Sequence, residues 1–311
     1  MQLTSEDFAF LWKAMMDRDP SAGEVDVYYA MSKGIPSEVV SIIAQQSEFI
    51  MKHPSFVPKP IYADLLPAVA NGVEVLVPPN DWVHWGTKQG MGWEPHVAEA
   101  IRQYLKPGGV FIDIGANTGV LTMLGASIVG DAGQVYAVEA SIEVAMVLLA
   151  NVRHAKLTNT FVLPRAVTDT TRIEQIMVGH GTTNRFVRTE QIDLKKFNFE
   201  PILTDTIDSM LSHLNRVDLI KIDVEGREGS ALRGAAKLLD RTKPAIIAEY
   251  HYSSDEYYFA DELIARGYEV SLLDIGKQPI AFGQDHAALR EHGKANSIVF
   301  NELLFTLPGH H

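Results

Sequence analysis

Short β-branched runs alternate with longer segments of helical period from Val110 onward, and this alternation constrains the fold more than any other feature of the chain. The expected strands cover residues 110–114, 135–138, 161–163, 217–224, 245–249, 269–273 and 297–300. The expected helices cover residues 96–105, 118–129, 142–155, 229–239 and 255–266. Because repeated strand–helix–strand units place parallel strands in one sheet with helices on both faces, the pattern predicts a doubly wound, Rossmann-like α/β domain.

The two ends of this pattern are less regular. The last two expected strands are joined without a clear helix, so we expect an antiparallel edge on a mostly parallel sheet. Residues 170–205 follow neither the helical nor the strand period. Upstream, prolines at 54, 58 and 60 interrupt helical patterning. We therefore expect a helical module over 1–55, a connector over 56–95 and the α/β domain over 96–307.

The segments before the α/β domain carry weaker signals. Phe8, Leu11, Trp12 and Met15 recur at helical spacing, and apolar residues do so again over 39–49. In the connector, the apolar run 73–77 predicts one strand. We expect the N-terminal helices to serve recognition or assembly rather than catalysis.

Composition excludes several classes of protein. With 39 acidic against 27 basic residues and a formal net charge of -12, the chain repels polyanions, so we expect no nucleic-acid partner. The absence of cysteine removes disulfides, thiolate metal sites and cysteine nucleophiles. No apolar run approaches the roughly 20 residues of a membrane span, and the N-terminus lacks the features of a signal peptide. These features favour a cytoplasmic protein and leave its oligomeric state open.

A glycine-rich turn follows the first strand of the α/β domain. Its expected ligand-binding residues are Asp113, Gly115, Asn117, Thr118 and Gly119. Glycines let the backbone approach a ligand closely at the start of a helix. Twenty residues further on, at the end of the next strand, Glu139 can accept hydrogen bonds from both hydroxyls of a ribose, and Ala140 follows it. The two segments predict a nucleoside pocket at the carboxyl edge of the sheet.

The order of residues in the turn favours a methyl donor over a dinucleotide. A pyrophosphate-binding loop usually contains G-x-G-x-x-G, which is absent here. A carboxylate at Asp113 suits the amino group and sulfonium of S-adenosylmethionine better than two phosphates. Adenine is expected near residues 166–169, with Asp169 as a candidate partner of its exocyclic amine. The alternatives are a nicotinamide-dependent oxidoreductase and a noncatalytic nucleoside-binding scaffold.

A second group of charged residues follows the fourth and fifth strands. Asp223 and Glu225 come at the carboxyl end of one strand, where doubly wound sheets place ligands, whereas Lys221 suits a structural salt bridge. Glu249 and His251 share a face at the end of the neighbouring strand. The expected catalytic residues are therefore Asp223, Glu225, Glu249 and His251, with Asp223 also near the cofactor. No metal ligand is assigned, although this cluster could also hold a divalent cation such as Mg²⁺.

The motifs IDIGANTG and DLIKIDVEGREGSALRGA, together with Glu139, resemble the FkbM family of methyltransferases over roughly residues 94–250. The resemblance implies a class I methyltransferase fold, S-adenosylmethionine as donor, and transfer to a hydroxyl oxygen, commonly on a sugar, glycan or polyketide. Ala140 departs from the family, which usually has proline after the acid. Residues 5–50 are similar to a short module often fused to bacterial surface-glycan proteins. Together these resemblances imply a small-molecule or glycan acceptor, whose identity the sequence does not give.

Overall fold

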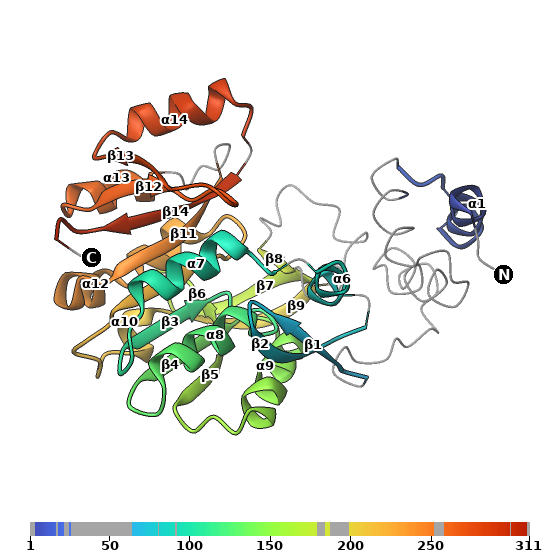
Figure 1. Cartoon of the computed structure of the whole chain (residues 1–311), viewed down its shortest axis with the longest axis horizontal. Helices are drawn as coiled ribbons and strands as arrows, with labels where there is room; N and C mark the ends of the chain where they lie inside the picture. The colour runs from blue at the N-terminus through green and yellow to red at the C-terminus, as the bar shows by residue number, and fades with distance from the viewer. Residues whose placement is uncertain are drawn as a thin grey trace.

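The computed structural model describes residues 4–16, 18–21, 25, 64–79, 81–90, 92–178, 184–186, 199–251, 258–298 and 300–309. Among these residues, eight strands form a central sheet in the order β13-β12-β14-β11-β10-β3-β4-β5 (Figure 1). The strands are β3 (Val110–Ile114), β4 (Gln134–Glu139), β5 (Thr160–Pro164), β10 (Leu219–Ile222), β11 (Ala245–His251), β12 (Glu269–Leu272), β13 (Ile280–Gly283) and β14 (Phe300–Thr306).

The sheet is parallel from β5 to β11 and antiparallel from β11 to β13. Its helices are α7 (Pro95–Tyr104), α8 (Val120–Val129), α9 (Ile142–His154), α10 (Ile207–Met210), α11 (Glu228–Arg233), α12 (Ala236–Thr242), α13 (Phe259–Ala265) and α14 (His286–Ala295). The predicted doubly wound fold with an antiparallel edge is confirmed.

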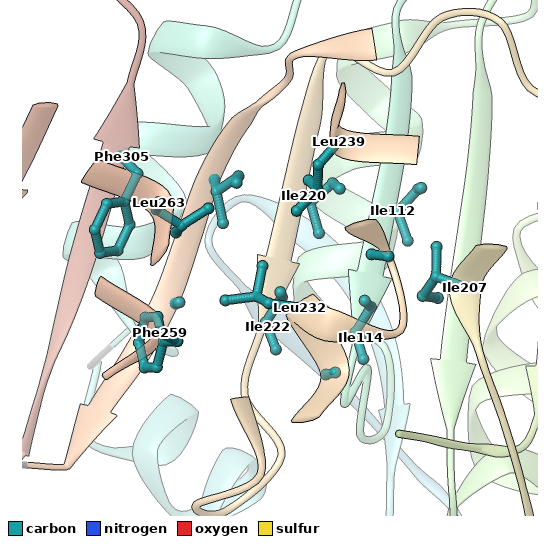
Figure 2. Close-up of a cluster of buried hydrophobic side chains, with 14 of the residues drawn as sticks. Ile112, Ile114, Ile207, Ile220, Ile222, Leu232, Leu239, Phe259, Leu263 and Phe305 are labelled. Carbon is teal, nitrogen blue, oxygen red and sulfur yellow. The ribbon is translucent and has the colours of Figure 1, made fainter. Parts of the chain in front are cut away.

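Both faces of the sheet are buried at its central strands β3 and β10, which explains why these strands are apolar except for Asp113 and Lys221. On one face, Ile112, Ile220 and Ile222 pack with Leu232 from α11 (Figure 2). On the other face, Phe111 packs with helices α7 and α8. Successive residues of a strand point to opposite faces, so Phe111 and Ile112 belong to different cores. A strand covered by helices on both faces is typical of a parallel sheet.

The C-terminal part of the pattern required correction. The strand expected at 297–300 runs instead from Phe300 to Thr306. A short strand, β13, and a ten-residue helix, α14, lie before it, although no clear helix was expected there. Helix α14 buries only His286, Leu289 and Gly293, so a single large apolar residue was available to mark it in the sequence. The antiparallel pairing of the two expected strands, β12 and β14, is nevertheless confirmed.

The helix expected over 229–239 is also divided. It forms α11 and α12, which are separated at Gly234 and Ala235. A β-carbon at Gly234 would lie 2.1 Å from the carbonyl oxygen of Thr168. The close approach of this loop explains why the helix is interrupted at a glycine, and no helical period in the sequence reports such a tertiary contact.

Residues 170–205, which had no assignment, contribute to a second sheet. Its order is β6-β9-β7-β8, with β6 (Ala166–Val167), β7 (Arg172–Val178), β8 (Asn184–Phe186) and β9 (Phe199–Asp205). Strands β7 and β9 pair antiparallel. Its first strand, β6, follows β5 in the chain and contacts β4, the strand that ends at Glu139.

The connector packs on the α/β domain. The predicted strand at 73–77 is confirmed as β2 (Val73–Val77), which pairs with β1 (Leu66–Ala70), and α6 (Trp82–Lys88) follows. Buried Val75, Val77 and Val83 pack against Val120 and Met123 of α8. The connector therefore shares a core with the domain, while the domain boundaries stay a prediction.

The N-terminal helix α1 (Ser5–Met16) agrees with the expected period. Thr4 and Asp7 cap it reciprocally: Thr4 N donates to Asp7 at 2.8 Å, and Asp7 N donates to Thr4 Oγ1 at 3.2 Å. Phe8 and Trp12 are buried. The helical expectation for 39–49 lies outside the described residues. Within the described part of the chain, every helix is too short or too polar to cross a membrane.

Candidate active site

The glycine-rich turn is held between two neighbouring strands. Gly115 N and Ala116 N both donate to the Val138 carbonyl of β4, at 2.9 and 3.0 Å. Gly115 has a φ of 74°, and a β-carbon there would lie 1.7 Å from the carbonyl oxygen of Asp223. A side chain at this position would collide with the backbone that follows β10, and it would also block the approach of a ligand to the turn.

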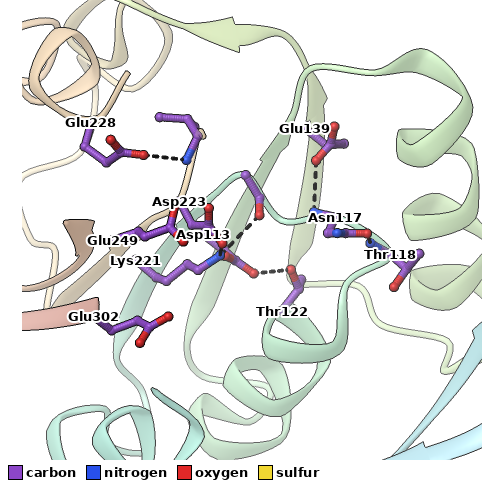
Figure 3. A network of polar contacts seen from close by, with 12 residues as sticks. Asp113, Asn117, Thr118, Thr122, Glu139, Lys221, Asp223, Glu228, Glu249 and Glu302 are labelled. Atoms are coloured by element: carbon purple, nitrogen blue, oxygen red, sulfur yellow. Dashed lines mark hydrogen bonds and ion pairs between the residues drawn. The ribbon is translucent and has the colours of Figure 1, made fainter. Parts of the chain in front are cut away.

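Glu139 at the end of β4 organises the turn. Its Oε2 accepts from Asn117 N at 2.9 Å (Figure 3), and its Oε1 accepts from Ser141 N, also at 2.9 Å. The side chain is buried, and burial raises the pKa of its carboxyl group. Each carboxylate oxygen has two lone pairs, so one remains on each oxygen to accept from a ribose hydroxyl.

Asp113 and Lys221 lie side by side in the centre of the sheet, where their strands pair directly. Asp113 accepts from Thr122 Oγ1 at 2.6 Å, but its buried Oδ1 has no partner among the described residues. Lys221 Nζ lies 3.3 Å from Asp223 Oδ2 and 3.3 Å from the Gly115 carbonyl oxygen (Figure 3). Burial alone lowers the pKa of Lys221, but the carboxylates of Asp223, Glu94 and Asp113 raise it by more. The salt bridge expected for Lys221 is therefore present, with Asp223 as its partner.

A histidine and two carboxylates meet where the carboxyl end of β11 approaches the start of α11. His251 Nε2 lies 2.6 Å from Glu249 Oε2, and this hydrogen bond raises the pKa of His251. Glu228 Oε1 accepts from Val224 N and Gly226 N, which shapes the loop before α11. One ligand atom each of Glu228, Glu249 and His251 lie within 4.8 Å of one another, close enough to share a cation.

A cavity of about 300 Å³ opens at the carboxyl ends of β3, β4, β10 and β11. Most predicted site residues line it: Asp113, Gly115, Asn117, Thr118, Glu139, Ala140, Asp223, Glu225 and Glu249. Gly119 and His251 lie behind this lining, Gly119 as the N-cap of α8 and His251 against Glu249. The structure does not bring Asp169 to the cavity, because its carboxylate pairs with Arg233 at 3.2 Å. Ala166 and Val167 do line the cavity, near the expected adenine position.

Sequence reasoning missed several residues of this cavity. Glu94 precedes α7, Glu302 lies on β14, and Trp82, Trp93 and Phe300 supply aromatic lining. One signal could have located Glu94. Proline is common at the first position of a helix, so Pro95 places the preceding acid at the N-terminal end of α7. Glu302 was missed because the last strand was expected to end at residue 300.

The charge of the cavity decides which cofactor it fits. Its lining includes seven carboxylates and two basic side chains: Glu94, Asp113, Glu139, Asp223, Glu225, Glu249 and Glu302 against Arg165 and Lys221. S-adenosylmethionine carries a sulfonium and an ammonium group, whereas a dinucleotide carries two phosphates. The buried, unpartnered oxygen of Asp113 and the carboxylate at Glu139 suit the methionine and ribose parts of the first ligand. Fold and site together define a class I methyltransferase.

The chain belongs to the FkbM methyltransferase family, since the family model described as Methyltransferase FkbM domain matches residues 113–270. This membership favours methyl transfer over the nicotinamide-dependent alternative. No curated protein matches the chain.

Three solved structures illustrate the similarity of fold. The FkbM methyltransferase of Methylobacillus flagellatus is 16% identical with a TM-score of 0.43, and the match covers 67% of this chain and 50% of that chain. The fibrillarin of Aeropyrum pernix with bound S-adenosyl-L-methionine is 13% identical, with 79% and 84% covered and a TM-score of 0.42. An rRNA methylase of Streptococcus thermophilus is 12% identical, with 68% and 94% covered and a TM-score of 0.38.

We expect the replacement of Glu139 by alanine to weaken S-adenosylmethionine binding by a factor of about ten or more, because removing charge-assisted hydrogen bonds costs roughly 1.5–3 kcal/mol. The change also leaves Asn117 N and Ser141 N without their acceptor. Calorimetric titration measures the dissociation constant, and Glu143→Ala, in the helix that follows, is the matched control. A folded Glu139→Ala protein with wild-type affinity for the donor contradicts the assignment.

Proposed function

We propose that the protein is an S-adenosylmethionine-dependent O-methyltransferase that acts on a hydroxyl group of a sugar, glycan or related metabolite. The observation that carries the proposal is one cavity lined both by Asp113 and Glu139 and by three further acids, Asp223 and Glu225 after β10 and Glu249 on β11. The first pair suits the donor. The second group suits an acceptor whose proton has to be removed.

The donor, when bound, supplies a methyl group activated by its positively charged sulfur. The protein has to align the acceptor oxygen with that methyl group and accept the hydroxyl proton. Asp223 and Glu249 line the cavity, and Glu249 shares a hydrogen bond with His251. Asp223 is the first candidate to accept this proton. The Glu249 and His251 pair is the next, because Glu249 raises the pKa of the histidine that would hold the proton.

The acidic lining also restricts the acceptor. Seven carboxylates against two basic groups repel phosphate, so the part of the acceptor that enters the cavity is uncharged or positively charged. Trp82 and Phe300, 36% and 53% exposed, add aromatic side chains to the lining. Aromatic faces pack against the C–H surface of a sugar, while carboxylates accept from its hydroxyls. The same negative charge disfavours nucleic acid as the acceptor. We also propose a cytoplasmic location, where S-adenosylmethionine is present.

An acceptor screen tests this proposal. Purified protein is incubated with methyl-labelled S-adenosylmethionine and a panel of free, nucleotide-activated and lipid-linked sugars, with ribosomal RNA as a comparison. We expect label in a methyl ether of a sugar, located by NMR, and none in RNA. Reactions without acceptor measure background. Label that enters RNA, or a nitrogen or carbon atom of any acceptor, contradicts the proposal.

A further inference from the structure

Glu94 lines the cavity but belongs neither to the glycine-rich turn nor to the acids of β4, β10 and β11. It stands directly before α7 in a left-handed conformation, with φ 43° and ψ 60°. Residues other than glycine adopt this conformation only when their surroundings impose it, and they concentrate at functional sites. The structure therefore holds the Glu94 side chain at the cavity in spite of a backbone cost.

The usual role of an acidic residue at this position is to cap the helix, and Glu94 does not have that role. Its side chain makes no capping hydrogen bond. Part of the residue is accessible, but its Oε2 is buried and has no partner among the residues that the structure describes. A buried carboxylate oxygen without a donor is costly unless a ligand satisfies it.

The charges that face Glu94 come from four elements. Asp113 on β3, Asp223 after β10 and Glu302 on β14 are negative, and Lys221 on β10 is the positive neighbour. Lys221 is already paired with Asp223, and His96 of α7 is paired with Glu302 at 2.6 Å. Glu94 is thus surrounded by carboxylates whose cationic partners are shared, which disfavours its ionised form until a positive charge is added.

We propose that Glu94 is the counter-ion of the positively charged methionine end of S-adenosylmethionine and binds it directly from the cavity wall. The inference rests on the proposed use of this donor. It adds a donor-binding residue outside the glycine-rich turn and the ribose carboxylate. The donor's ammonium and sulfonium groups are separated by only a few bonds, so one carboxylate beside Asp113 can serve either of them.

Proton release follows from this contact. Burial raises the pKa of Glu94 to about 8, so the group is mostly protonated at pH 7 before the donor binds. A cationic ligand favours the ionised carboxylate, which means that binding expels the proton. Affinity for the donor therefore rises with pH, by up to about tenfold per unit between pH 6 and pH 8, and about one proton leaves per donor at pH 7.

The test compares Glu94→Gln with the wild-type protein by calorimetry without an acceptor. Titrations with S-adenosylmethionine at pH 6, 7 and 8, in buffers of different ionisation enthalpy, give both the affinity and the number of protons released. We expect Glu94→Gln to bind the donor at least tenfold more weakly at pH 8 and to release about one proton fewer at pH 7. Glu94→Asp keeps the charge and retains proton release. Glu99→Gln, an exposed change on the same helix, is the control.

S-adenosylhomocysteine, which keeps the ammonium but lacks the charged sulfur, locates the contact. Equal weakening of both ligands assigns Glu94 to the ammonium, and weakening of the methylated ligand alone assigns it to the sulfonium. A Glu94→Gln protein that binds both ligands within twofold of wild type, with the same proton release, overturns the inference. Failure of the acceptor screen leaves this binding result unaffected, so the two proposals fail separately.

Discussion

Asp223→Asn lowers the rate of methyl transfer by a factor of about 10² or more, while the dissociation constant of S-adenosylhomocysteine changes only a few fold. The substitution keeps the size of the side chain and the oxygen that faces Lys221, 3.3 Å away, but removes the negative charge. An amide cannot accept the proton of a hydroxyl acceptor. The loss therefore falls on the chemical step rather than on folding or product affinity.

The position of Asp223 makes this prediction specific. It follows β10 directly, lines the cavity, and raises the pKa of Glu249 together with Glu225, although burial is the larger cause of that shift. Glu225→Gln, in the same loop, lowers the rate for the same reason. Single-turnover measurements with saturating donor separate the chemical step from binding. Asp240→Asn, an exposed ion-pair partner of Arg266, is the matched control.

Normal turnover by both acidic variants on the true acceptor contradicts the catalytic assignment of these carboxylates. The proton acceptor then lies elsewhere in the lining, and the Glu249 and His251 pair becomes the next candidate. A large loss of S-adenosylhomocysteine affinity in Asp223→Asn gives a different answer, because it assigns Asp223 to the cofactor alone.

The central half of the fold was predictable because its physical causes are local. Strand β3 was predicted with its observed bounds, and β4, β5 and β11 to within two residues, since each is an apolar run between turn residues. The predicted turn residues and Glu139 follow such strands, so parallel pairing alone brings them to one edge. Short, strongly apolar strands therefore located most of the cavity.

The remaining part of the site depends on contacts that are distant in sequence. Glu94 and Glu302 reach the cavity because α7 and β14 pack beside β3 and β11, and no periodicity reports which elements become neighbours. Asp169 shows the converse error. Its position after β6 is the one expected for a partner of adenine. In the structure its carboxylate forms an ion pair with Arg233 of α11 and does not reach the cavity. Local patterns thus predict where such residues lie along the chain, but they do not predict which residues they contact in the folded protein.

Gly115→Ala is the substitution with the largest expected effect on the structure. A β-carbon at this position lies 1.7 Å from the backbone oxygen of Asp223, and a backbone atom cannot move aside as a flexible side chain does. Either the glycine-rich turn or the loop after β10 has to shift, and both belong to the donor cavity. We expect a marked loss of thermal stability together with loss of measurable S-adenosylmethionine binding.

A second glycine separates the two causes of this effect. Gly108 has a φ of 75°, nearly the 74° of Gly115, but a β-carbon there meets nothing within 4 Å. Gly108→Ala therefore pays only the left-handed backbone cost, about 1–2 kcal/mol, and keeps donor binding. The difference between the two variants, measured by thermal unfolding and by calorimetry with the donor, isolates the clash with Asp223. Equal destabilisation and equal donor affinity in both variants contradict the close packing of the turn against β10. Selective loss of donor binding in Gly115→Ala instead shows that the contact between the turn and the Asp223 backbone sets the shape of the cofactor cavity.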